Sequence, residues 1–142
     1  NGPTVNESLE TSIPGVFACG NVLHVHDLVD YVSEEAQQAG KHAAAYVQGA
    51  AAAQGREIPL KPQGAARYTV PVSLCPQRRV RFRVGRNIRG GVVKVFAGDK
   101  LLYQRKRPVM APGEMEQVVF QKAWFTGGEA EIRLVAEEEE AQ

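Results

Sequence analysis

The spacing of apolar residues changes near residue 66, and this change divides the chain into two parts. In the first part, apolar residues recur every three or four positions, at Leu28, Val32, Ala36, Ala39, Ala43 and Tyr46. This spacing predicts a helix with one apolar stripe. In the second part, Val80, Phe82 and Val84 alternate with arginines, which predicts a strand with one polar face. The sequence therefore predicts an α+β chain, with a helical part followed by a β-rich part.

The β-rich part contains six segments with the composition of strands, separated by turns that carry Gly or Pro. They cover residues 67–70, 79–84, 92–97, 100–107, 115–120 and 130–136. Short strands at this density predict a small antiparallel β-sandwich of about six strands over residues 66–137. The preceding residues 51–65 are rich in Ala, Gln and Gly and are interpreted as a linker, and residues 138–142 as a solvated acidic tail.

The helical part begins with a turn and a short apolar run. Pro14 and Gly15 mark the turn, and the run at residues 16–20 predicts a strand buried on both faces. Asp27 is suited to cap the helix that follows, and acidic residues in its first turns favour the positive end of the helix dipole. We expect this helix to end near Gln48.

Charge is distributed unevenly between the two parts. Residues 1–54 hold six acidic residues and one basic residue, whereas residues 55–142 hold ten acidic and sixteen basic residues. The basic strand carries Arg79, Arg81 and Arg83, which allows three interpretations: a solvated face, a surface that docks on the acidic part, or a phosphate-binding surface. We take solvation as the default and do not expect binding to nucleic acid. No apolar run has the roughly 18 residues that a membrane helix needs.

The run Thr11-Ser-Ile-Pro-Gly-Val-Phe-Ala-Cys-Gly-Asn21, followed by a helix with a face of small residues, carries a resemblance to a known family. It resembles the closing segment of the FAD domain in the pyridine nucleotide-disulfide oxidoreductases of the glutathione-reductase and thioredoxin-reductase type. In that family a Thr, a Pro-Gly turn and a hydrophobic strand ending in Ala-x-Gly-Asp precede such a helix. The resemblance covers residues 1–50 and is densest over residues 11–47. It implies that these residues supply one strand and one helix of an FAD-binding, Rossmann-like domain.

The resemblance also implies which residues contact the cofactor. Gly20 would let the backbone approach FAD, and the next residue, normally Asp, would hydrogen-bond its ribityl or phosphate part. This residue is Asn21 here, which can accept and donate hydrogen bonds but carries no charge. Val22, the residue after Asn21, is also expected at the cofactor. The backbone amides near Val32 and Ser33 would stabilise negative charge on the reduced flavin.

The chain lacks the Gly-rich G-x-G-x-x-G turn with which a dinucleotide fold begins, and it contains no C-x-x-C pair. The resemblance then implies the C-terminal portion of a longer FAD-dependent NAD(P)H oxidoreductase, unable to hold FAD alone. Activity would belong to the full-length enzyme and not to the fragment. Hydride would pass from the nicotinamide to the flavin, and we assign no catalytic residue to this chain.

His24 and His26, followed by Asp27, could offer two metal ligands. No third ligand is identifiable, so we expect no metal and interpret both histidines as lining the flavin or substrate side of the pocket, or as filling a loop. His42 is interpreted as structural. Cys19 and Cys75 are too few for a disulfide scaffold, and reduced thiols fit the cytoplasm.

The β-rich part more loosely resembles the small C-terminal domain that follows the flavin domain in a group of bacterial reductases, on the basis of residues 110–115. An interaction role, including a homodimer, is the expectation for it. The expected partner of the first part is the remainder of the flavoprotein chain. The alternative is that residues 66–136 act as a stand-alone interaction module that binds anionic partners through its basic strands. Without its sheet neighbours, the first part should pack on the sandwich, associate with a second copy or be poorly ordered.

Overall fold

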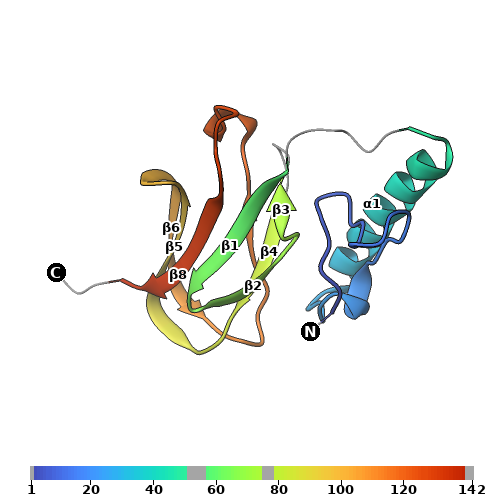
Figure 1. The fold of residues 1–142 in the computed structure, drawn as a ribbon. Coiled ribbons are helices and arrows are strands. Elements are labelled where there is room, and N and C mark those ends of the chain that lie inside the picture. Colours follow the sequence, from blue (N-terminus) through green and yellow to red (C-terminus); the bar gives the residue numbers. More distant parts are fainter. Residues whose placement is uncertain (1, 51–56, 75–78, 140–142) are drawn as a thin grey trace.

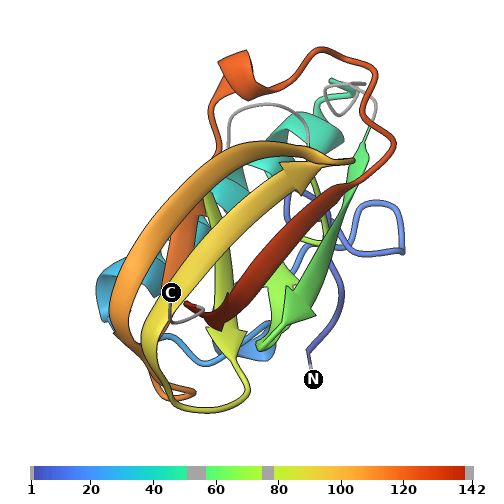
Figure 2. The same ribbon diagram turned by 90° about the vertical axis from the view of Figure 1, so that its left-hand side faces the viewer.

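The structure, a computed structural model, describes residues 2–50, 57–74 and 79–139. It consists of three layers (Figure 1): a five-stranded sheet, a three-stranded sheet, and an N-terminal unit that contains the long helix α1. Figure 2 shows the five-stranded sheet in front and α1 behind it. The predicted α+β fold, with a helix followed by a small β-sandwich, is confirmed.

The five-stranded sheet has the order β3-β1-β8-β5-β6. Its strands are β1 (Ile58–Gly64), β3 (Ser73–Leu74), β5 (Ile88–Ala97), β6 (Lys100–Met110) and β8 (Ile132–Glu138). The three-stranded sheet has the order β2-β4-β7, from β2 (Ala66–Val70), β4 (Arg79–Val84) and β7 (Glu116–Val119). A short 3-10 helix, η2 (Lys122–Trp124), joins β7 to β8. All six predicted strands are present.

The predicted linker needs correction, because its second half forms β1. This strand pairs in parallel with β8 and antiparallel with β3, so the sandwich includes one parallel pair. Prolines at positions 59 and 62 hid the strand in the sequence. The remaining linker residues 51–56 lie outside the described residues.

The predicted acidic tail, residues 138–142, also needs correction at its start. Glu138 belongs to β8, and its carboxylate pairs with Arg86, as that of the preceding Glu137 pairs with Lys94. Glu139 pairs with Lys106 on β6. These residues continue the central strand β8 at its C-terminal end instead of fraying, and residues 140–142 lie outside the described part of the chain.

The core lies between the two sheets. Sixteen buried apolar residues of the described chain form it, and they come from all eight strands and the segment after β7. On β4, Val80, Phe82 and Val84 are at most 1% exposed, as the alternation predicts. The opposite face of β4 presents its arginines to the N-terminal unit, so the three-stranded sheet is covered on both faces.

The N-terminal unit contains little regular structure besides η1 (Gly20–Val22) and α1 (Val29–Val47). The predicted strand over residues 16–20 is reduced to one bridge between Glu10 and Phe17. It is wrong as a buried strand, because no neighbouring strand in the described chain extends the pairing. Among the described residues, no helix combines the length and the apolar character that a membrane span requires.

Helix α1 buries only part of the predicted stripe. Ala39 is buried and Val32 and Ala43 are half-buried, whereas Leu28, Ala36 and Tyr46 are exposed. The other buried residue of the helix is Glu35, which lies outside the stripe. A buried carboxylate on this face can be accommodated only if it has partners. Those partners define the candidate site.

Candidate functional site

Glu35 lies at the centre of a polar cluster between α1, the loop before it and strand β4. Its Oε1 accepts hydrogen bonds from the Gly20 amide, at 2.6 Å, and from His26 Nε2, at 3.1 Å. Its Oε2 lies 3.3 Å from His24 Nε2 and 3.6 Å from a terminal nitrogen of Arg81. The carboxylate therefore joins three segments that are distant in the sequence.

The cluster excludes water. The side chains of His24, His26 and Glu35 are 3%, 0% and 3% exposed, and the two imidazole rings lie 4.4 Å apart between centroids. Burial raises the pKa of the Glu35 carboxyl, but hydrogen bonds from His24, the Gly20 amide and His26 outweigh it. The pKa therefore lies below its ordinary value, and Glu35 is an anion at neutral pH.

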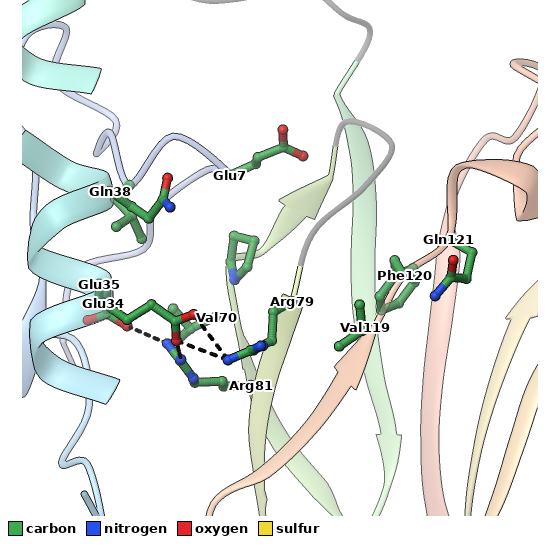
Figure 3. A pocket seen from close by; sticks show the side chains of 12 residues that line it. Glu7, Glu34, Glu35, Gln38, Val70, Arg79, Arg81, Val119, Phe120 and Gln121 are labelled. Carbon is green, nitrogen blue, oxygen red and sulfur yellow. Dashed lines mark hydrogen bonds and ion pairs between the residues drawn. The ribbon is translucent and has the colours of Figure 1, made fainter. Parts of the chain in front are cut away.

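The arginines of β4 attach the sandwich to this cluster (Figure 3). Arg79 and Arg81 both donate hydrogen bonds to Glu34, and Arg81 also faces Glu35. Farther along the strand, Arg83 donates to the Asp27 carboxylate and to the Val25 carbonyl. Of the three interpretations of this basic strand, docking on the acidic part is the one realised within the chain, and the default of a solvated face is wrong.

Asp27 is not the helix cap that the sequence suggests. The N-cap of α1 is Leu28, which makes no side-chain capping hydrogen bond. The Asp27 carboxylate instead accepts hydrogen bonds from Arg83 and from the Met115 amide. A charged partner and a backbone amide on the sandwich together outcompete the local capping interaction.

The residues predicted to contact FAD lie near one another. Gly20 is buried with a φ of +70°, a left-handed conformation that favours glycine. Asn21 and Val22 follow in η1 and are exposed, and Asn21 Oδ1 accepts a hydrogen bond of 3.4 Å from the His26 amide. A Cβ added at Gly20 would meet the Val32 side chain at 3.5 Å, so Val32 packs beside the same turn.

Val32 and Ser33 lie in the second turn of α1, where helical amides already bond to carbonyls one turn earlier. The amides at the helix start belong to Val29 and Asp30. A contribution of Val32 and Ser33 to flavin binding stays a prediction, and the amides best placed for an anion lie three residues earlier.

A cavity of about 750 Å³ lies between the N-terminal unit and the sandwich, and Asn21 and Val22 are on its wall. Asn21, Val22 and His24 line one side, and Arg67 and Tyr68 of β2 line the other. Burial raises the pKa of the Tyr68 hydroxyl, partly offset by Arg83, so it remains a neutral hydrogen-bonding group at neutral pH. A second cavity, of about 550 Å³, lies between α1 and the edge of the three-stranded sheet, and Glu7, Gln38 and Arg79 are on its wall (Figure 3).

The two other groups singled out in the sequence take less part in the site. His42 donates from Nδ1 to the Ser8 carbonyl, at 2.9 Å, which fits its structural interpretation. Cys19 is a free, half-buried thiol, and Cys75 lies outside the described residues. Sequence reasoning missed Glu35 as a site residue, because nothing in the local sequence distinguishes it from the other acidic residues of the helix.

Comparison of the chain with protein-family models, with curated proteins and with solved structures yields no match.

Proposed function

We propose that this chain is the C-terminal portion of an FAD-dependent NAD(P)H oxidoreductase. Residues 1–50 supply the closing flavin-binding segment, and the β-sandwich serves interaction or dimerisation. Gly20, Asn21 and Val22 contact the flavin. Nicotinamide and flavin carry the redox chemistry, and the chain contributes placement and hydrogen bonds. The cytoplasm is the expected compartment.

The observation that carries the proposal is the turn at Gly20 and Asn21. A glycine at a φ of +70° is followed by an exposed amide side chain, at the wall of a 750 Å³ cavity. A cavity of this size matches those that hold cofactors. Asn21 and Val22 line it, whereas Gly20 is buried and is not among the lining residues.

The exposed apolar surface of the N-terminal unit gives independent support. Of the twelve large apolar side chains that are exposed among the described residues, eight lie between positions 13 and 47. Val29 and Val47 on α1 are 75% and 83% exposed. The remainder of a flavin domain would cover such a surface, because a strand and helix of that fold pack within a larger sheet.

The alternative of an independent anion-binding module has less support. It depends on the basic strand and on a second basic run at residues 105–107. Arg79, Arg81 and Arg83 face carboxylates of the N-terminal unit, and Lys106 and Arg107 pair with carboxylates of the sandwich. The charge of these five residues is therefore engaged within the chain.

The test uses the longer gene product that contains this chain. Purified, it should show the visible absorption of bound flavin, and NADH or NADPH should bleach it. Asn21→Ala should lower the flavin content, whereas Asn6→Ala, in the same unit but not among the residues that line the cavity, should leave it unchanged. A colourless product, or equal flavin content in both variants, contradicts the proposal.

A further inference from the structure

Three side chains of the cluster carry atoms that are suited to bind a metal ion. His24, His26 and Glu35 each offer a ligand atom, and these atoms all lie within 4.8 Å of one another. Two imidazoles and one carboxylate are a donor set that binds zinc, with a fourth position left for water or another ligand. We propose that His24, His26 and Glu35 bind one divalent transition-metal ion of the zinc type. The metal proposal does not rest on the flavin-binding role, although His24 also lines the cavity assigned to flavin.

The distances between the donor atoms fit a single ion. Bonds of zinc to imidazole nitrogen and carboxylate oxygen are about 2.0–2.2 Å, so tetrahedral neighbours lie roughly 3.3 Å apart. His26 Nε2 lies 3.1 Å from Oε1 of Glu35 and His24 Nε2 lies 3.3 Å from Oε2, and one ligand atom from each residue lies within 4.8 Å of the other two. An ion can therefore take the place of the protons that join these atoms, once the side chains draw the donor atoms together to tetrahedral separations. Each neutral imidazole then carries its proton on Nδ1.

The backbone and the neighbouring rings hold the donors in place. The Gly20 amide fixes one oxygen of Glu35, at 2.6 Å, and α1 supplies a rigid support for this side chain. The His24 ring packs edge-on against Tyr68, with centroids 5.9 Å apart. Such support on rigid elements is what a metal site requires.

The charge of the cluster also favours a cation. Glu35 is a buried carboxylate, and burial of an anion is costly unless a cation compensates it. The protein cation beside it is Arg81, at 3.6 Å, but the same guanidinium makes its shorter contact, 2.5 Å, with Glu34. Arg81 therefore serves mainly Glu34, and Glu35 retains negative charge for an ion between the histidines.

The surroundings of the second nitrogen of each imidazole predict moderate affinity for the metal ion. Metal-bound imidazoles usually donate their second N–H to a partner, and loss of such partners typically weakens binding 10–100-fold. The Nδ1 atoms of His24 and His26 are buried, and neither has a hydrogen-bond partner within the described part of the chain. We therefore expect binding to be 10–100-fold weaker than at a site with these outer hydrogen bonds.

Calorimetric titration of the 142-residue chain with zinc chloride tests the proposal. One ion should bind per chain. His26→Gln and Glu35→Gln should each reduce the affinity at least tenfold. His42→Gln is the matched control, because His42 lies on the same helix as Glu35 but bonds to the Ser8 carbonyl. It should bind zinc as the original chain does.

A second measurement avoids any loss of folding in the variants. In the unaltered chain, zinc should shift the imidazole nitrogen resonances of His24 and His26 and leave those of His42 in place. Absence of zinc binding overturns the proposal. So does binding that persists in Glu35→Gln, as it would if the thiols were the ligands, or resonances that shift only at His42.

Discussion

The sandwich and the N-terminal unit bury different kinds of side chain. The sandwich encloses sixteen apolar residues, whereas the N-terminal unit encloses only Val5, Leu9, Leu23 and Ala39 among the described residues. The contact between the two parts is largely polar and charged, and α1 places a carboxylate where an ordinary amphipathic helix places apolar side chains. The sandwich thus completes its own core, while the N-terminal unit leaves its apolar residues for something else to cover.

The largest expected effect contrasts the two parts directly. Phe82 is fully buried in the sandwich, so Phe82→Ala should lower the free energy of unfolding by about 3–5 kcal/mol. Val29 on α1 is 75% exposed, and Val29→Ala should change the free energy of unfolding by less than about 0.5 kcal/mol. Urea denaturation of both variants measures the difference. Similar losses would mean that the two parts do not differ as described.

Removal of the guanidinium of Arg81 should loosen the polar contact between the two parts. Its side chain is 8% exposed and pairs with Glu34, and hydrogen bonds to charged groups contribute about 1.5–3 kcal/mol. Arg81→Met should therefore speed amide hydrogen exchange in α1 without affecting β5. Arg86→Met is the control, because Arg86 and Glu138 are both more than half exposed and their pair is worth less than about 1 kcal/mol. Unchanged exchange in α1 would mean that the arginine contacts do not hold the N-terminal unit.

Replacing each of two glycines of the N-terminal unit by alanine should change the stability of this unit in opposite directions. Gly20→Ala should destabilise this unit by about 1–2 kcal/mol, because its φ of +70° is left-handed. Gly40 lies inside α1 with no atom near an added Cβ, so Gly40→Ala should stabilise the helix by up to about 1 kcal/mol. Hydrogen exchange of α1 reports both. Destabilisation by Gly40→Ala would contradict the open surface of the helix.

The smallest expected effect concerns a surface loop of the sandwich. The Thr126 amide and hydroxyl donate to Glu129 and, with the Gly127 amide, lower the pKa of its carboxyl from 4.5 to about 2. The ionised group therefore stabilises the fold above about pH 4.5, and this contribution is lost as pH falls through 2. Glu129→Gln should abolish it. Nuclear magnetic resonance of the Glu129 carboxyl carbon as a function of pH measures this pKa. An ordinary value would show that the loop does not form these hydrogen bonds.

Local patterns in the sequence predict much of the sandwich. Alternation on β4 correctly assigns Val80 and Phe82 to the core, because strand periodicity depends only on neighbouring residues. The sequence does not reveal β1, since its prolines and glycine resemble a linker. It becomes a strand by pairing with β3 and with β8, the latter some seventy positions later in the chain.

The N-terminal unit is less predictable because its helix is oriented by tertiary contacts. The apolar stripe predicts that Leu28 and Tyr46 face inward, but of the stripe only Ala39 is fully buried. Glu35 is buried as well, held by Gly20, His24 and His26. The His-x-His pair is visible in the sequence. Its third member lies nine residues after His26, and nothing local identifies it.

The most direct test of the central claim is hydrogen exchange of the longer gene product with and without FAD. If residues 1–50 close the flavin site, FAD should protect the amides at Gly20, Asn21 and Val22 and leave those of β5 unchanged. Equal exchange at this turn in both states would contradict the assignment of these residues to flavin.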